Sequence, residues 1–312
     1  RNKNRKLEDN EISLTASRID VFRFAFLIFF FIRDSLFFLK KAILWDSVLF
    51  FEQFRQIITR YTYEAFFLKH SAKSFFVMDD YANEHIVRTM VLRNFGIKSI
   101  SYNHGLPFRI NQAHIWKYID YDLYYVYGMF IYNKYYKKTW SNKTIVKAVG
   151  SLRIPTKCYP KMKIQDRPKD ILFLWGRTEK TKFDNELINA IYVLSDTFKD
   201  RKIYVRPKPT RIADGAANNL LKVLVSHPRD NIILEDEDLT GMYLTYDLMV
   251  KSTYAIGVGS TAVAEAVQCG CISFFLDYDK RTDDVYYRNF KEFCVENISD
   301  VILKIKGIES KV

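Results

Sequence analysis

The sequence predicts an α/β protein with two lobes, each built around a parallel sheet. Short apolar stretches with strand character alternate with stretches whose apolar residues recur at helical spacing, as in β–α–β units. The alternation starts near residue 74, stops at a charged stretch and starts afresh at residue 170. The length of 312 residues is also sufficient for two lobes. We expect a helical segment at 1–70, lobes at 71–155 and 156–285, and a C-terminal helix at 286–312.

The first lobe is predicted from four apolar stretches and the helical patterns between them. The expected strands are 74–80, 97–102, 122–128 and 144–150, and the expected helices are 82–96 and 131–140. Gly96 is expected to end the first of these helices as its C-cap. Residues 151–170 contain three prolines and many charges, which predicts a linker between the lobes.

The second lobe repeats the same alternation. Its expected strands are 170–176, 202–209, 231–236, 254–260 and 271–279, and its expected helices are 185–198, 240–252 and 261–270. From Tyr286 onward the pattern is that of an amphipathic helix.

The net charge and the cysteine content indicate which kinds of partner and which compartment to expect. The net charge of +12 favours an anionic partner, which could be nucleic acid, an anionic membrane surface or a phosphorylated small molecule. The four cysteines show neither metal-ligand spacing nor a dense disulfide framework. A reduced, cytosolic compartment fits this cysteine usage best.

The run "FAFLIFFFI" at residues 24–32 raises the question of membrane contact. Its nine apolar residues lie between Arg23 and Arg33 and fall well short of the roughly 20 that a spanning helix needs. Two interpretations stay open: a helix buried in a core, or an interfacial helix lying on an anionic membrane. The second would use the flanking basic residues Arg18, Arg23, Arg33, Lys40 and Lys41. In either case we expect a protein that does not cross the membrane.

The stretch "GVGSTAVAEA" at 257–266 follows a predicted strand and opens a predicted helix. Free backbone N–H groups at such a helix start suit a phosphate, and Gly259 lets a ligand approach the backbone. Ser260 and Thr261 add hydroxyl groups, and Glu265, one helical turn after Thr261, could accept from ribose hydroxyls. A helix-capping motif with a solvated glutamate is the simpler alternative.

Two more strand ends in the second lobe carry cations. "YVRPKPTR" presents Arg206 and Lys208 on a loop stiffened by prolines, and "WGRTEK" presents Arg177 and Thr178. Preorganised cations suit a diphosphate or a carboxylated sugar, although a solvated basic turn has the same composition. Ligands of parallel sheets bind at the carboxyl ends of the strands, so we expect the three strand ends to form one donor site.

Candidate catalytic residues follow two strands of the first lobe. Asp79 and Asp80 end one strand, Glu84 begins the next helix, and His104 ends the neighbouring strand. A carboxylate or a histidine could serve as the base that deprotonates an acceptor hydroxyl, and a carboxylate could instead act as a nucleophile. The alternatives are an aspartate pair at a helix N-cap and a turn shaped by the glycine and proline after His104.

Several motifs occur in an order that resembles a known family. "HGLP", "DLYYVYG", "VGSLR", "RPKP" and "DLMVKS…GVGSTAVAEAVQCG" resemble bacterial GT-B glycosyltransferases of surface polysaccharide synthesis. The nearest groups are the capsule and lipopolysaccharide transferases that use CMP-activated 3-deoxy-octulosonic acid (Kdo), and the CDP-glycerol glycerophosphotransferases. The resemblance spans about residues 74–280.

The resemblance implies two Rossmann-like lobes, an interlobe cleft, a nucleotide donor on the C-terminal lobe, and neither a metal nor another cofactor. His104 matches the His-Gly motif, which implies a role as catalytic base, and Ser260, Thr261 and Glu265 match the nucleotide-binding segment. Lys208 stands where a histidine is usual, which favours a phosphate contact there.

The function expected from these observations is transfer of a sugar, such as Kdo or another acidic sugar, from a CMP- or CDP-linked donor. The acceptor would be a surface polysaccharide or a glycolipid at the inner face of the cytoplasmic membrane. The alternatives are polyol-phosphate transfer from a CDP-linked donor, a sugar-nucleotide epimerase, a membrane-associated scaffold without catalytic activity, and a basic nucleic-acid-binding protein. We do not expect nucleic acid as a partner, because the aromatic residues fall within apolar strand and helix patterns.

Overall fold

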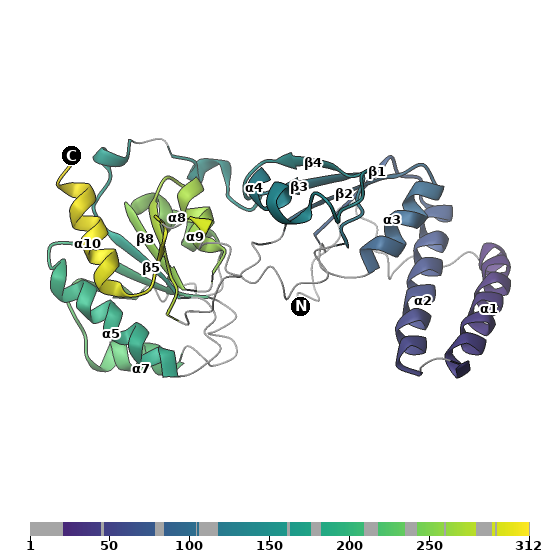
Figure 1. Ribbon diagram of the computed structural model, residues 1–312, viewed down its shortest axis with the longest axis horizontal. Helices are drawn as coiled ribbons and strands as arrows, with labels where there is room; N and C mark the ends of the chain where they lie inside the picture. Colours follow the sequence, from purple (N-terminus) through teal and green to yellow (C-terminus); the bar gives the residue numbers. More distant parts are fainter. Residues whose placement is uncertain are drawn as a thin grey trace. The chain divides into compact units, whose positions relative to one another are not determined.

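The computed structural model describes residues 21–44, 47–78, 84–103, 105, 118–160, 163–175, 182–208, 218–234, 242–258, 260–278, 289–290 and 292–311 (Figure 1). The chain divides into two compact units. Unit 1 comprises residues 1–104 and 114–147, and unit 2 comprises residues 105–113 and 148–312.

The described part of unit 1 begins with two helices, in the segment for which the sequence predicts helical structure. Helices α1 (Val21–Leu44) and α2 (Ser47–Lys69) lie side by side (Figure 1). Phe30 and Phe31 of α1 pack against Ile57 and Tyr61 of α2. No helix within the described ranges is both long enough and apolar enough to cross a bilayer.

The described part of unit 1 also contains a four-stranded sheet in the order β1-β2-β3-β4. Its strands are β1 (Ser74–Val77), β2 (Lys98–Tyr102), β3 (Leu123–Val126) and β4 (Ile145–Ala148). The pairs β1–β2 and β2–β3 are parallel, as expected. Between β1 and β2 the chain forms α3 (Glu84–Asn94), and Gly96, with φ of 69°, follows its end at the predicted position.

One detail of unit 1 differs from the sequence-based expectation. The helix expected at 131–140 is instead a short α4 (Met129–Ile131) that continues as the π-helical turn η2 (Tyr132–Tyr136). Trp140 lies beyond it and stacks on Tyr136, with ring centroids 5.1 Å apart. Aromatic packing, which helical periodicity does not report, thus shapes the end of this segment.

The described part of unit 2 is a six-stranded sheet in the order β10-β9-β8-β5-β6-β7, with every neighbouring pair parallel. The strands are β5 (Ile171–Trp175), β6 (Ile203–Pro207), β7 (Ile232–Leu234), β8 (Tyr254–Val258), β9 (Ile272–Leu276) and β10 (Cys294–Val295). The helices are α5 (Lys182–Thr197), α7 (Asn218–Ser226), α8 (Met242–Lys251), α9 (Ala262–Gln268) and α10 (Ile298–Glu309).

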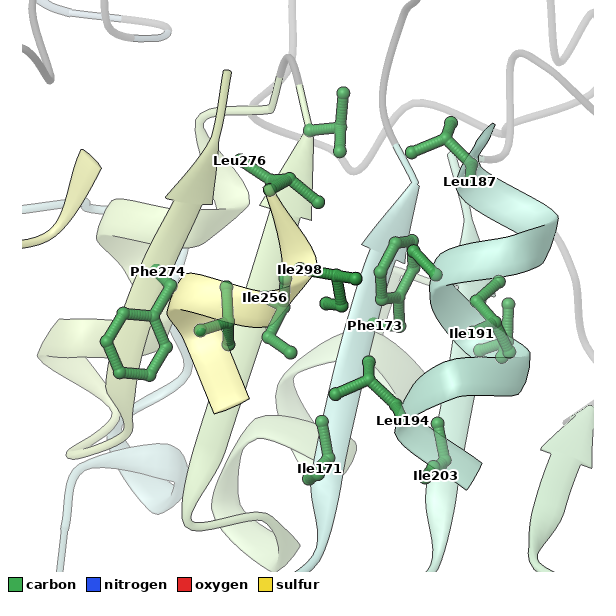
Figure 2. Close-up of a cluster of buried hydrophobic side chains, with 14 of the residues drawn as sticks. Ile171, Phe173, Leu187, Ile191, Leu194, Ile203, Ile256, Phe274, Leu276 and Ile298 are labelled. Carbon is green, nitrogen blue, oxygen red and sulfur yellow. The ribbon is translucent and has the colours of Figure 1, made fainter. Parts of the chain in front are cut away.

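Strand β5 shows why this sheet has helices on both faces. All five of its residues are buried. Ile171, Phe173 and Trp175 enter one core with residues of α5, α7 and α10, part of which Figure 2 shows. Leu172 and Leu174 point the other way and enter a second core with residues of α8 and α9. A continuous apolar run is what a central parallel strand requires.

The strand order contains one reversal. From β5 the chain proceeds to β6 and β7 on one side, and it then returns to β8 on the other side of β5 and continues to β9 and β10. The carboxyl ends of β5 and β8 therefore flank a topological switch point, where open α/β sheets form a crevice for ligands.

The stretch at 151–170, predicted to be a linker, belongs to unit 2 in the structure, and its described residues pack into that unit. Ile154 and Cys158 are buried in the core beneath α8 and α9. The buried guanidinium of Arg167 donates to the backbone oxygens of Cys269 at 2.7 Å and Ser252 at 3.4 Å. A few widely spaced side chains anchor this stretch, and its prolines and charges gave no local pattern that would predict them.

Helix α10 is fixed to the sheet by a partly buried ion pair. Arg201 donates through both Nη atoms to the two carboxylate oxygens of Glu309, at 2.9 and 2.8 Å. The Tyr254 hydroxyl donates to the same carboxylate at 2.9 Å. Burial works to raise the pKa of Glu309, but these hydrogen bonds outweigh it and hold the pKa below its usual value.

Candidate functional site

The candidate site lies at the carboxyl edge of the unit 2 sheet. The strand register pairs Trp175, the last residue of β5, with Pro207 of β6 on one side and Val258 of β8 on the other. The three strands thus end level with one another at the topological switch point. The residues that follow them are the ones for which the sequence predicted anion binding.

The end of β6 presents one buried cation and one exposed cation. Arg206 is buried on the strand, and its Nε donates to Thr245 Oγ1 of α8 at 3.2 Å. The backbone N–H of Lys208 donates to the oxygen of Trp175 at 2.9 Å, which continues the pairing of β6 with β5, while the side chain of Lys208 is exposed. The guanidinium is therefore held by α8, and the ammonium is available to a ligand.

The end of β8 turns directly into α9. Ser260 Oγ accepts from the backbone N–H of Ala262 at 3.2 Å, and Thr261 is the N-cap residue of α9. A Cβ atom at Gly257 would collide with a methyl group of Val263, so only glycine lets α9 approach β8 this closely. The close approach fixes the turn that carries both hydroxyl groups.

The glycine of the His-Gly motif lies against this turn. Gly105 is buried and belongs to unit 2, and a Cβ atom placed on it would be 3.1 Å from Thr261 Oγ1. The structure thus brings together two of the motifs that carry the family resemblance. His104 itself lies outside the described residues.

Glu265 is buried on α9 and does not point into solvent, which differs from the solvated alternative. Its Oε1 accepts from Ser151 Oγ at 2.9 Å, and its Oε2 accepts from the Tyr246 hydroxyl at 3.3 Å. Gln268, one turn further along α9, accepts from the backbone N–H of Ser151 at 2.7 Å. The carboxylate therefore joins α9 to α8 and to the start of the 151–170 stretch.

The predicted catalytic residues are described only in part. Glu84 is the first residue of α3, and its carboxylate pairs with Arg55 of α2. Asp79, Asp80 and His104 lie outside the described residues, as do Arg177, Thr178 and Gly259 of the predicted donor site. Their roles remain predictions.

Metal ligands do not gather anywhere in the part of the chain that the structure describes: it contains no group of three or more histidine, cysteine or carboxylate side chains placed to hold an ion. Cys158, Cys269 and Cys271 are buried free thiols. Burial raises the pKa of Cys269 and of Cys271 to about 12.

Three supporting residues were not predicted: Thr245, Tyr246 and Ser151. Thr245 and Tyr246 lie within an ordinary apolar helix pattern, so nothing in the local sequence marks them. Ser151 belongs to the "VGSLR" motif, and the resemblance could have drawn attention to it. Its partner, however, is 114 residues away in the sequence, which no local pattern reveals.

No protein-family model and no curated protein sequence matches the chain. Its fold is nevertheless similar to solved structures. A proposed UDP-N-acetylglucosamine 2-epimerase from Listeria monocytogenes superposes with a TM-score of 0.58 at 9% identity, covering 82% of this chain and 72% of that one.

Two further structures are similar over the same extent. The UDP-GlcNAc 2-epimerase of Methanocaldococcus jannaschii has a TM-score of 0.54 at 14% identity, with 81% of this chain and 75% of that chain covered. The Neisseria meningitidis UDP-GlcNAc 2-epimerase bound to UDP-GlcNAc has a TM-score of 0.51 at 13% identity, with 82% and 72% covered. At such low identities the similarity establishes the fold alone. It confirms the predicted α/β, GT-B-like fold with Rossmann-like sheets.

Proposed function

We propose that the protein is a metal-independent glycosyltransferase that uses a nucleotide-activated sugar. The observation that carries the proposal is the composition of one sheet edge. Where β5, β6 and β8 end level at the topological switch point, the chain presents Arg206, Lys208, Ser260 and Thr261. Cations and hydroxyl groups fixed at such an edge suit the phosphate groups of a nucleotide donor.

The proposed donor carries a pyrimidine nucleotide. The motif resemblance favours cytidine with Kdo or another acidic sugar, whereas one of the similar structures, which holds UDP-GlcNAc, favours uridine. A pyrimidine ring, a ribose and at least one phosphate are common to both. The ribose contact predicted for Glu265 belongs to this proposal, beside the two hydrogen bonds that its carboxylate already accepts.

The proposed reaction needs a base on the acceptor and a stabilised leaving group on the donor. A base removes the proton of the acceptor hydroxyl, the oxygen attacks the anomeric carbon, and the bond to phosphate breaks with its electron pair on the nucleotide. His104 or Asp80 would act as the base. Asp79 and Glu84, which lie near Asp80 in the sequence, are the other candidates. Because Glu84 already pairs with Arg55, it is the least suited of the four. Arg206 and Lys208 would stabilise the charge on the departing phosphate.

The acceptor would be a surface polysaccharide or a glycolipid, reached from the inner face of the cytoplasmic membrane. This part of the proposal is supported by the motif resemblance and by the net charge of +12. Polyol-phosphate transfer from a CDP-linked donor is the variant of the same site that the resemblance also suggests.

A sugar-nucleotide epimerase is the second candidate function, because the similar structures described above are 2-epimerases. The two functions differ in what they require. An epimerase changes UDP-GlcNAc at C2 without any acceptor, which NMR of the sugar protons detects. A transferase leaves C2 unchanged and releases nucleotide only when an acceptor is present.

The proposal is tested by thermal denaturation in the presence of CMP, CDP, UMP, UDP and GDP. A nucleotide at a concentration 100 times its dissociation constant should stabilise the folded protein by about 2.7 kcal/mol. We expect this from a cytidine or uridine nucleotide and not from GDP. Failure of every nucleotide to raise the melting temperature would contradict the proposal.

A further inference from the structure

Helix α1 is apolar around most of its circumference, but only one side of it packs against α2. Phe30 and Phe31 contact the cluster formed by Ile57 and Tyr61. Asp34 lies on the same side, where its carboxylate accepts from the Tyr61 hydroxyl at 3.0 Å. This packing leaves the opposite side of the helix facing solvent.

The opposite side carries two parallel lines of residues. One line is aliphatic, the other alternates aromatic and basic, and both follow the spacing of four, four and three residues that keeps side chains on one helix face. Six large apolar side chains among them are between 37% and 68% exposed, and Arg33 and Lys40 are exposed as well. We call this the α1 outer face; its residues are Ile28, Ile32, Leu36 and Leu39 in one line and Phe29, Arg33, Phe37 and Lys40 in the other.

We propose that the α1 outer face binds the surface of an anionic lipid membrane. Soluble proteins seldom leave a contiguous patch of large apolar side chains in water, and a helix that is apolar all round belongs in a core or in lipid. Since α1 does not qualify as a spanning helix, it would lie in the plane of the membrane interface. The inference rests on α1 and not on the nucleotide site.

The distribution of charge favours lipid over a second copy of the chain. Helix α1 contains four basic residues and a single carboxylate, Asp34, which is on the α2 side and pairs with Arg33 and Arg60. The α1 outer face itself carries no carboxylate, so a two-fold contact between copies would give Lys40 no counter-charge. Anionic headgroups instead provide a counter-charge for Lys40, and they add to the one that Asp34 already gives Arg33. Both long side chains can reach headgroups while their stems lie on the apolar surface.

Residues 1–20 are also poorly suited to cover this face. Five of them are basic and four are acidic, and their apolar residues are scattered. Covering an apolar stripe requires apolar residues that recur at a fixed spacing. A lipid surface can cover the α1 outer face without any such sequence spacing.

The test is sedimentation of the full chain with phosphatidylcholine vesicles that contain or lack phosphatidylglycerol. Leu36→Asp places a charge in the middle of the α1 outer face. Its matched control is Leu303→Asp, which alters a leucine of similar exposure on α10 of unit 2. We expect the wild type and Leu303→Asp to bind the anionic vesicles, and Leu36→Asp to bind them at least about tenfold more weakly. Replacing Arg33 and Lys40 together by glutamine should reduce the preference for anionic vesicles and its sensitivity to salt.

Circular dichroism checks that the variants fold, and Leu36→Ser repeats the test with a neutral side chain. Absence of wild-type binding to anionic vesicles would overturn the proposal, as would an equal loss in Leu303→Asp. Light scattering provides the remaining check. A wild-type dimer that Leu36→Asp dissociates would assign the face to a second copy instead of lipid.

Discussion

Replacing Glu265 by alanine separates a structural role from a ligand-binding role. The carboxylate accepts one hydrogen bond from Ser151 and one from Tyr246, and all three residues are buried. The alanine variant removes both acceptor oxygens and leaves two hydroxyl groups without these partners. If the network holds α9 in place, the free energy of unfolding must fall.

The size of the effect follows from the two bonds. A hydrogen bond to a charged group contributes about 1.5–3 kcal/mol, and a buried hydroxyl left unsatisfied costs a similar amount. We therefore expect Glu265→Ala to lose about 3–5 kcal/mol, a large part of the roughly 5–15 kcal/mol that stabilises a typical domain. Glu265→Gln keeps the shape and one acceptor oxygen, so it should lose about 1–2 kcal/mol.

Urea denaturation measures the loss, and nucleotide titration measures affinity in the same variants. Tyr246→Phe removes one of the two donors without a cavity and should lose about 1 kcal/mol. The structural account would be refuted if Glu265→Ala unfolded within about 0.5 kcal/mol of the wild type. Loss of nucleotide affinity at unchanged stability would show that the carboxylate serves the ribose and not the fold.

Three further predictions concern unit 2. Gly257→Ala should lower stability in urea denaturation by about 1–3 kcal/mol because its new methyl group meets Val263. Adding Val263→Ala should recover part of this loss, and strictly additive effects in the double variant would contradict the contact. Glu309→Gln should lower the free energy of unfolding at neutral pH, because the pKa of Glu309 is lowered in the folded state. The difference in stability between this variant and the wild type should persist above pH about 5 and shrink as the pH falls through the folded-state pKa. Cys269 and Cys271, whose pKa values burial raises to about 12, should react with a thiol reagent at pH 8 only after unfolding, and rapid reaction in the native state would contradict their burial.

The fold could be predicted because its signals are local. The five buried residues of β5 form an uninterrupted apolar run, and Gly96 marks the end of α3. The predicted ends of β5, β6 and β8 then fixed which side chains reach the sheet edge. Lys208 and Ser260 were found in this way, because a strand end is visible in the sequence.

The remaining features depend on distant contacts. Helical spacing places Glu265 and Thr261 on neighbouring positions of one face, but only the approach of Ser151 makes the carboxylate a buried acceptor. The role of Arg167 could not be predicted either, because it lies in a stretch whose prolines and charges predicted a linker. The backbone oxygens to which it donates are 85 and 102 residues away in the sequence. Single-sequence patterns do not contain this information, because such pairs form only when the chain is folded.

The central claim, that the carboxyl edge formed by β5, β6 and β8 binds the donor phosphates, is tested most directly with two lysines. Lys208 and Lys202 are both exposed, and they lie just beyond opposite ends of β6, so they face opposite edges of the same sheet. Calorimetry with the nucleotide that gives the largest thermal shift should show about tenfold weaker binding for Lys208→Ala, the loss of one charge-assisted contact worth about 1.5 kcal/mol. Lys202→Ala should bind as the wild type does. Equal affinities in both variants, or a greater loss in Lys202→Ala, would contradict the assignment of this edge as the nucleotide site.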